Sequence, residues 1–479
     1  MAQNMKKSMA GIIGALAVVE FVSGILQGYY IPLLTDVAQH FGVHDADVNW
    51  LEGSQLMFSA LMVPLFAKLG DRVGHAKMLL LSTALTAAAS LALVFAGNWW
   101  LFLAAWTLQG VYTVWLPLEI ALVWARAADS PTSKAQTAKA AGILVCFLEV
   151  GAICGALAGG ALIDAFPLQL VLVIPAVAVV LCTLAVLFFV RDRTQLGAWY
   201  TAEQATTHAT TQRAAFDSRG LVLLSLALLC LTGGLSMFRV PALVGYAALA
   251  VVAGLVVLVP FVRHALRHAD PLIDVRMFRN PALWPLFLTA GLFGMSVLGA
   301  QAPLSTFART DPAVYGYGLG VKGFTVSLLI GVYVLMMAVG ALLFPLIRRW
   351  WGAKNALTLA AFIVGCAYLL FLPFHDTYTQ TLLNMMLAGV GSGMLVAALP
   401  AAAAAAAPQT QTGVATGLTN SVKTVGGAVA SCVFGIALLQ GAAGSAGSLS
   451  GYLTVWTICG LSALVAALCL LLIVPKRAL

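Results

Sequence analysis

Apolar stretches of about 20 residues alternate with short polar segments along the whole chain. A stretch of this length can cross the hydrocarbon core of a membrane as one helix. We therefore predict an all-α integral membrane protein whose fourteen spans lie at residues 11–36, 48–69, 78–97, 98–126, 139–163, 168–190, 220–238, 241–262, 283–306, 321–347, 355–373, 380–403, 413–440 and 451–474.

Two polar segments divide these spans into groups of six, two and six. The first segment runs from Arg191 to Arg219, and the second covers residues 263–282. Duplicated six-helix bundles are common among secondary transporters, which bind substrate near the membrane midplane between the two repeats. The layout predicts an N-terminal bundle at 1–190, cytoplasmic linker segments with two extra spans at 191–282, and a C-terminal bundle at 283–479.

Composition excludes several other classes of protein. Hydrophobic residues make up 61% of the 479 residues and charged residues only 9%, whereas a soluble domain carries about 25% charged residues. The net charge of +8 is spread singly through short loops, so we expect no nucleic-acid partner. The eight cysteines lie in apolar stretches without a CxxC pattern, and the seven histidines lie in loops or at membrane edges. With no nucleotide or nucleophile motif present, we expect no metal site, no cofactor and no enzymatic activity.

The basic residues predict how the chain is oriented. If both termini are cytoplasmic, 21 of the 25 Lys and Arg residues fall in cytoplasmic segments. Arg239, Arg309 and Lys322 fall on the opposite side, and Lys423 falls within a span. This bias agrees with the positive-inside rule and supports an even number of spans.

Four charged side chains lie inside predicted spans, where an ionisable group is costly and is by default a candidate for function. At 1.5 Å per residue, Glu20 lies ~14 Å into span 1, while Glu149 and Lys423 lie ~15 Å into spans 5 and 13. Glu119 lies about 10 Å from the cytoplasmic end of span 4. Their similar depths predict one hydrated central cavity.

Polar and aromatic residues share helical faces with three of these charges. The predicted cavity residues are Glu20, Gln27, Tyr112, Trp115, Glu119, Glu149, Asn420 and Lys423. A carboxyl group in such a place can exchange protons near neutral pH, and the aromatic rings can stack against a flat or cationic compound. The alternatives are that each acid only bonds to a neighbouring helix, and that Lys423 is a snorkelling residue or the counter-ion of an acid.

A short loop and a glycine-rich helical face are further candidates. The loop between spans 2 and 3 contains Asp71, Arg72 and Gly74, and Arg126, at the end of span 4, is a candidate partner of Asp71. The loop can equally serve only the positive-inside rule. In span 5 glycines recur every four residues, which favours close helix packing. These glycines are Gly151, Gly155 and Gly159, with Gly160 beside the last.

These features resemble the major facilitator superfamily and, more narrowly, its fourteen-span drug:proton antiporter branch. The loop keeps Asp71, Arg72 and Gly74 of the pattern Gly-x-x-x-Asp-Arg-x-Gly-Arg-Arg/Lys, with Ala67 at the leading Gly. Span 5 is similar to the antiporter motif Gly-x-x-x-Gly-Pro-x-x-Gly-Gly, with Ala156 in place of Pro. The segments Pro271–Asn280 and Gly413–Gly427 also look like this branch. Two departures concern proton coupling, because Ser23 stands where the branch has an Asp and Trp106 where it has an Arg.

The resemblance implies a secondary transporter of the bacterial cell inner membrane that works by alternating access. It implies proton-coupled efflux of amphipathic or cationic small molecules, with the loop Asp71–Lys77 as a conformational latch. The expected partners are a small-molecule substrate, protons and membrane lipids, and the protein is expected to be a monomer. Two alternatives remain open within transport, a dedicated metabolite exporter and an uncoupled facilitator. A third is a membrane sensor that no longer transports.

Overall fold

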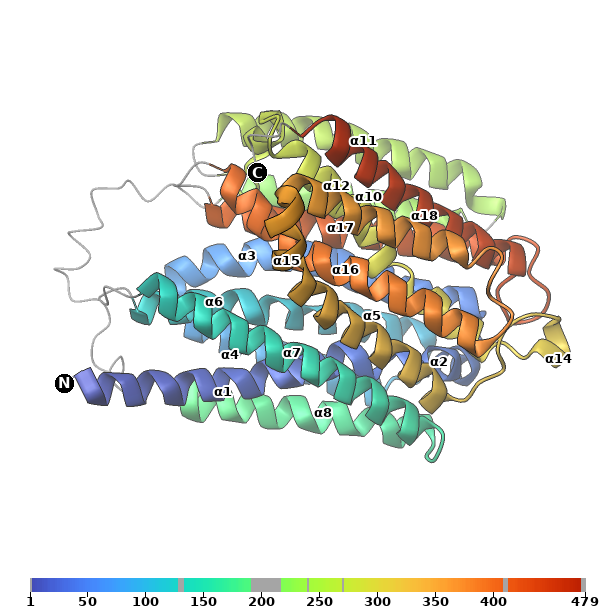
Figure 1. Ribbon diagram of the computed structural model, residues 1–479. Helices are drawn as coiled ribbons and strands as arrows, with labels where there is room; N and C mark the ends of the chain where they lie inside the picture. Colours follow the sequence, from blue (N-terminus) through green and yellow to red (C-terminus); the bar gives the residue numbers. More distant parts are fainter. Residues whose placement is uncertain are drawn as a thin grey trace.

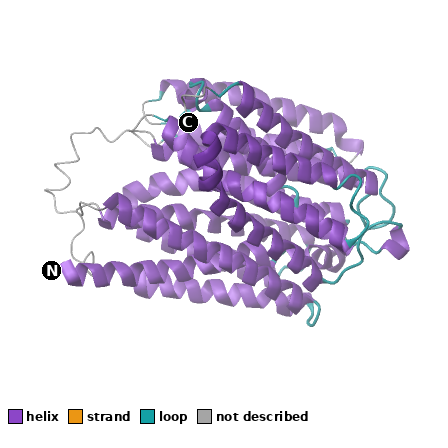
Figure 2. Ribbon diagram, viewed as in Figure 1, coloured by secondary structure: helices purple, strands orange, loops and turns teal. Residues whose placement is uncertain are grey.

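The computed structural model describes residues 2–127, 133–190, 217–238, 241–268, 271–407 and 412–474. Every regular element within these ranges is a helix (Figure 2). The first helix, α1 (Ala2–Tyr29), begins at the same end of the bundle at which the last, α18 (Leu449–Leu472), finishes (left in Figure 1). We call this end the terminal end and the opposite one the far end. Most of the first predicted polar segment, at 191–216, lies outside the described residues.

The remaining elements follow in chain order. Up to residue 190 they are η1 (Ile31–Leu33), α2 (Leu34–Phe41), η2 (Asp45–Val48), α3 (Asn49–Val73), α4 (His75–Val94), α5 (Trp99–Gln109), η3 (Gly110–Val114), α6 (Trp115–Ala127), α7 (Ser133–Ile163), α8 (Leu168–Ala185) and η4 (Val186–Val190). After it they are α10 (Ser218–Met237), η5 (Pro241–Leu243), α11 (Val244–Arg267), η6 (Val275–Arg279), α12 (Trp284–Val297), α13 (Gln301–Arg309), α14 (Pro312–Tyr315), α15 (Gly323–Leu370), α16 (Tyr378–Ala406) and α17 (Thr412–Leu439).

Several predicted spans are helices interrupted by a short turn of different pitch. Pro32 has no backbone N–H with which to continue α1, and the chain passes through the 3-10 turn η1 before α2 begins. In span 4 the 3-10 turn η3 separates α5 from α6, two residues ahead of Pro117. Irregular backbone at membrane depth is tolerated where it is enclosed by protein. Both interruptions meet this condition, because the residues of η1 and most residues of η3 are buried.

The described residues contain twelve helical stretches long and apolar enough to cross a membrane, not the fourteen predicted. Two features account for the difference. The helix α15 is counted once although its 48 residues, at 1.5 Å each, would extend about 72 Å against a hydrocarbon core of ~30 Å. It breaks at Gly352, whose φ of 81° is left-handed. The helix α3 is 25 residues long but is absent from the twelve, because polar residues such as Glu52 and Gln55 lower its mean hydropathy.

Two large hydrophobic cores divide the bundle. Apart from Ala302 and Ala46, one core is built from residues between Leu16 and Val190, and the other from residues between Met277 and Val474. Helices in matching positions make matching contacts, since α1 packs on α7 as α12 packs on α17. Across the boundary, α3 packs on α17 as the first part of α15 packs on α7. We call the two parts the N half and the C half.

The helices α10 and α11 pack on each other and lie along the outside of the bundle (yellow-green in Figure 1). They cover the seam between α3 of the N half and α17 of the C half. Asp217, just before α10, accepts hydrogen bonds from Gly220 N at 2.8 Å, from Leu272 N at 3.0 Å and from His264 Nε2 at 2.6 Å. Burial alone would raise the pKa of Asp217, but these bonds and the charge of His264 hold it below its usual value. The hydrogen bonds of Asp217 fix α10 and α11 to the segment around Leu272, which leads into the C half.

Candidate functional site

Glu20 on α1 and Glu119 on α6 face each other inside the N half. Both residues have 0% exposed surface, and their carboxyl groups are close enough to interact directly. Among the described residues, none of their oxygen atoms has any other hydrogen-bond partner. Buried polar atoms in native proteins nearly always have a partner. Two carboxyl groups of the same sign cannot form an ion pair with each other, so this contact is unlike the other charged contacts of the bundle.

A hydrogen-bonded polar layer lies between this pair and the far end. Gln109 donates through Nε2 to the hydroxyl of Tyr30 at 3.0 Å and to Ser90 Oγ at 2.9 Å. Gln55 Nε2 donates to the carbonyl of Trp106 at 3.3 Å. Trp106 stands where the drug:proton antiporter branch has an Arg. This layer therefore contains aromatic and amide groups and no cation at that position. The layer ties α1, α3, α4 and α5 together.

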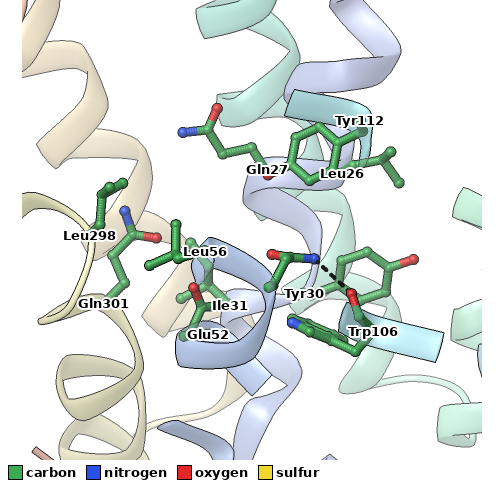
Figure 3. Close-up of a pocket in the computed structure, with 11 residues that line it drawn as sticks. Leu26, Gln27, Tyr30, Ile31, Glu52, Leu56, Trp106, Tyr112, Leu298 and Gln301 are labelled. Atoms are coloured by element: carbon green, nitrogen blue, oxygen red, sulfur yellow. Dashed lines mark hydrogen bonds between the residues drawn. The ribbon is translucent and has the colours of Figure 1, made fainter. Parts of the chain in front are cut away.

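A small cavity of ≈ 40 Å³ adjoins this layer (Figure 3). Gln27, Tyr30 and Tyr112 line it from the N half, and Leu298 and Gln301 close it from the C half. A water molecule needs roughly 10–15 Å³ of such volume, so the space holds a few waters. A drug-sized ligand needs about 300–1,000 Å³. The boundary between the halves is therefore nearly closed at this level.

Not all predicted cavity residues lie on this cavity. Gln27 and Tyr112 line the cavity, whereas Trp115 has 0% exposed surface and packs edge-on against Tyr112. Glu20 and Glu119 are enclosed within the N half, away from its lining. None of the four predicted charges lines this cavity, and their electrostatic neighbours group them as two pairs.

The second pair is formed by Glu149 on α7 and Lys423 on α17. Each side chain is half-buried, and each is a charged neighbour of the other. Asn420, one turn before Lys423, is exposed. Because α7 belongs to the N half and α17 to the C half, these opposite charges attract each other across the boundary between the halves. Their distance depends on how the halves are arranged.

The far end is held closed by polar contacts between the halves. Arg309 of α13 lies 2.8 Å from Asp36 Oδ1 and 3.8 Å from Asp164 Oδ1, both in the N half. Asp164 also accepts hydrogen bonds at 2.9 Å from the backbone N–H groups of Gly323 and Phe324, at the start of α15. We call Asp36, Asp164 and Arg309 the far-end cluster. Sequence analysis placed Arg309 on the outer side but had no basis for choosing its partners.

Asp45 lies beside the far-end cluster, and the pKa of its side chain is raised. Its backbone N–H donates to the carbonyl of Ser445 at 2.8 Å, which adds another link between the halves. Burial raises the pKa of Asp45 to about 7, with Arg309 opposing the rise and the charge of Asp36 adding to it. Protonation at this position is therefore possible near neutral pH.

At the terminal end, the predicted latch residues make local contacts. Asp71 Oδ1 lies 3.4 Å from His75 Nε2, four residues further on, and the Asp71 side chain is 73% exposed. Arg126 donates to the carbonyl of Val190 at 3.3 Å. Gly74 has a φ of 107°, a left-handed conformation that favours glycine at the sharp junction of α3 and α4. The loop thus makes its described ion pair within the N half.

The glycine-rich face of α7 serves two different contacts. A Cβ atom at Gly151, Gly155 or Gly159 would collide with the backbone of α1. A Cβ atom at Gly160 would collide with Ser327 and Gly323 of α15, in the C half. The first three therefore let α7 approach α1 within the N half, and the fourth lets the halves approach at the far end.

Asp217, His264 and His268 form a cluster that sequence analysis did not anticipate. Their potential ligand atoms lie within 4.8 Å of one another. Residue 217 and residues 264 and 268 come from separate polar segments, so only the pairing of α10 with α11 joins them. Because Asp217 is already held by two backbone N–H groups and His264, we interpret the cluster as an anchor for these helices.

Comparison with known proteins identifies the family. The family model described as "Major Facilitator Superfamily" matches residues 16–431 of the chain. The chain belongs to this superfamily. It is therefore a multi-pass membrane transporter and not an enzyme.

Two curated relatives are concerned with drug resistance. The chain is 33% identical over 180 residues to the multidrug resistance protein MdtG of Citrobacter koseri, covering 36% of this chain and 43% of that protein. It thus spans less than half of MdtG. It is 26% identical over 403 residues to the tetracenomycin C resistance and export protein of Streptomyces glaucescens, covering 82% of this chain and 69% of that one.

Solved structures support the fold. The nucleoside transporter NupG superposes with a TM-score of 0.64 at 14% identity, covering 96% of this chain and 98% of NupG. An auto-inhibited peptide transporter of the POT family superposes with a TM-score of 0.65 at 16% identity, covering 97% of this chain and 96% of that transporter. At these identities the likeness concerns the fold alone.

Proposed function

We propose that this transporter exports amphipathic or cationic small molecules in exchange for protons, by alternating access between its two halves. The observation that carries the proposal is the enclosed Glu20–Glu119 pair. Two adjacent carboxyl groups shielded from water cannot both be ionised without a large cost, so they share a proton. Gain or loss of that proton changes the charge between α1 and α6, which is what coupling to a proton gradient requires. The drug-resistance relatives support export as the direction.

Alternating access is supported by the asymmetry of the bundle. The far-end cluster and the Asp45–Ser445 contact join the halves at one end. An apolar seam containing Ile31 and Ala156 of the N half and Val326 of the C half lies at the same end. In this conformation the far end is closed, and we infer that substrate enters from the terminal end.

The orientation and span count complete the proposal. We assign the terminal end to the cytoplasm of a bacterial inner membrane, because the basic residues concentrate in the loops at that end. With α3 as a span and α15 divided at Gly352, the chain crosses fourteen times as two six-helix bundles, 1–190 and 283–479, with an inserted pair between them. We further propose that it acts as a monomer and that Asp71, Arg72, Gly74 and Arg126 form a latch.

Reconstitution in liposomes tests the coupling. Purified protein is reconstituted with a fluorescent amphipathic cation, ethidium, and a pH gradient is imposed across the membrane. Ethidium should accumulate against its own gradient on the acidic side, and accumulation should stop when a protonophore collapses the pH gradient. Equilibration of ethidium without dependence on pH would show an uncoupled facilitator instead.

Cysteine labelling in whole cells tests the orientation. Asp376→Cys, at the far end and 76% exposed as the aspartate, should react with an impermeant maleimide in intact cells. Lys134→Cys and Ala205→Cys should react only after permeabilisation. Reaction of Ala205→Cys in intact cells would contradict the fourteen-span topology.

A further inference from the structure

Glu149 and Lys423 lie at mid-depth, where the two halves face each other. By the rise per residue, Glu149 is ~21 Å from the far end of α7, and Lys423 is ~17 Å from the terminal end of α17. The helix α7 packs on α1 and α15, whereas α17 packs on α12 and α3. Each side chain is within electrostatic reach of the other across the boundary between the halves, and both are half-buried.

Two buried hydroxyl groups adjoin this pair on the side of the C half. Tyr333 on α15 is 6% exposed and Ser392 on α16 is 0% exposed. The two residues are neighbours, and Tyr333 also lies within the electrostatic reach of Glu149. Among the described residues, neither hydroxyl makes a well-formed hydrogen bond. The two hydroxyls are close enough to bond to each other, and a pair of buried hydroxyls that bond only to one another can still accept a further polar partner.

The charges at this place restrict which ligands can complete it. A simple cation is attracted by Glu149 but repelled by Lys423. A simple anion is attracted by Lys423 but repelled by Glu149. A molecule that carries both charges can pair with both residues and gives up neither attraction. Because the two residues belong to different halves, such a molecule would also connect the halves.

We propose that Glu149, Lys423, Tyr333 and Ser392 form a polar anchor that selects amphipathic zwitterions as substrates. Lys423 pairs with the anionic group of the substrate, Glu149 pairs with its ammonium group, and Tyr333 donates a hydrogen bond to the anionic group. Ser392 supports the Tyr333 hydroxyl. This inference rests on the proposed export function and narrows its substrate class. The competing explanation is that Glu149 and Lys423 only neutralise each other and stabilise the fold.

A matched series of dansyl compounds separates the two explanations. Nε-dansyl-lysine is a zwitterion, dansylcadaverine a cation, dansylglycine an anion and dansylamide neutral, and all share one fluorophore. Binding to the purified full-length protein is measured by dansyl fluorescence. We expect the zwitterion to bind about tenfold more tightly than each of the other three, as one additional favourable charge interaction would produce.

Substitutions should change the preference and not merely weaken binding. Lys423→Met should weaken the zwitterion about tenfold and strengthen the cation, whereas Glu149→Gln should weaken the zwitterion and strengthen the anion. Exchange of the charges, Glu149→Lys with Lys423→Glu, should restore the preference for the zwitterion. Tyr333→Phe should weaken the zwitterion and the anion by about fivefold and leave the cation unchanged. Lys322→Met, exposed at the far end, is the matched control and should change nothing.

Equal affinity of the wild type for all four probes would overturn the proposal, as would no measurable binding of Nε-dansyl-lysine. If both single variants bind all four probes equally less tightly, and the exchange variant restores binding of all four equally, the two residues form only a structural ion pair. That result would also overturn the proposal. Size-exclusion profiles confirm that each variant is folded, and the exchange variant keeps the test valid if a single variant is not. The liposome assay with ethidium is read separately. Selectivity for the zwitterion without pH-driven transport would contradict proton coupling and leave the anchor standing.

Discussion

Two pairs of charged side chains lie at mid-depth in this bundle, and only one of them crosses the boundary between the halves. Glu20 and Glu119 have the same sign, belong to the N half and are shielded from water. Glu149 and Lys423 have opposite signs, belong to different halves and are half-buried. When rigid halves rock, distances within a half are kept and distances between halves change. We therefore expect the first pair to respond by a change in protonation and the second by a change in geometry.

The same distinction applies to the ends of the bundle. At the far end, Arg309 of the C half pairs with Asp36 and Asp164 of the N half, so the contact exists only while that end is closed. At the terminal end, Asp71 pairs with His75 in its own half. Charges that span the boundary should control conformation, whereas charges within a half should control protons or local structure. The following variants test this division.

The largest effect is expected from the pair within the N half. Glu20→Gln and Glu119→Gln each keep the shape of the side chain but remove its ability to lose a proton. We expect uphill, pH-driven transport to fall at least about tenfold, which corresponds to ~1.4 kcal/mol, while downhill exchange continues. Transport by proteoliposomes with and without a pH gradient measures both.

Glu149→Gln is the comparison for this prediction. It should alter substrate binding and keep the dependence on the pH gradient, because it removes a charge that spans the boundary. If Glu20→Gln and Glu119→Gln both still concentrate substrate in a pH-dependent way, the coupling site has been assigned incorrectly.

The next effect concerns closure of the far end. Arg309→Gln leaves Asp36 and Asp164 without their shared cation, and we expect the equilibrium to shift toward far-end opening about tenfold, or ~1.4 kcal/mol. The readout is the labelling rate of Leu298→Cys, at the cavity, by an impermeant reagent added at the far-end side. The exposed Lys322→Gln is the matched control. Unchanged labelling in Arg309→Gln would mean that the apolar seam alone closes this end.

A smaller effect should depend on pH. Burial raises the pKa of Asp45 to about 7 in the closed state, against the opposing field of Arg309, whereas an exposed Asp has a pKa of about 3.9. The closed far end therefore binds this proton more tightly than an open one. Closure should be favoured progressively as the pH falls through about 7, and the gain should level off below about 4.

Labelling of Leu298→Cys from the far end should accordingly slow as the buffer is changed from about pH 8 to about pH 5, after correction for thiol reactivity with a free-thiol standard. Asp45→Asn should remove this dependence and behave at both values like the protonated wild type. A pH dependence that persists in Asp45→Asn would place the responsible group elsewhere.

The smallest effect is expected at the terminal end. Asp71 is 73% exposed and its ion pair with His75 is local, so the pair contributes little in this conformation. Asp71→Asn should lower the transport rate about threefold, through the conformation in which the loop contacts neighbouring helix ends. Expression and dansyl-probe binding should not change. Transport at the wild-type rate would show that the loop serves only the orientation of the chain.

The span count shows where pattern alone succeeds and where it fails. Apolar length predicts most helices, because a membrane helix must bury its backbone groups internally. The predicted count of fourteen differs from the twelve membrane-length helices of the described residues, because polar residues lower the hydropathy of α3 and α15 is one continuous helical run. In α15 a single left-handed glycine, Gly352, separates two segments that the sequence pattern predicts as two spans.

The candidate site shows the same limit. The depth of Glu20, Glu119, Glu149 and Lys423 along their helices follows from the sequence, since each residue of a helix adds a constant rise. Which charges meet does not follow, because it depends on how helices far apart in the chain pack. The same is true of Tyr333, a tyrosine in an apolar span whose sequence neighbours give no signal that its hydroxyl lies beside Ser392 and near Glu149.

The sequence by itself thus determined the membrane-spanning character, the basic bias of the loops and the membership of the superfamily. These properties depend on composition and on residues close together in the chain. The tertiary structure alone decided that the four charges within the spans are neighbours as two unlike pairs, that Arg309 contacts Asp36 and Asp164 at the far end, and that Asp217 anchors the inserted helices. Each of these depends on contacts between residues more than 40 positions apart, where side-chain packing and not the local pattern selects the partner.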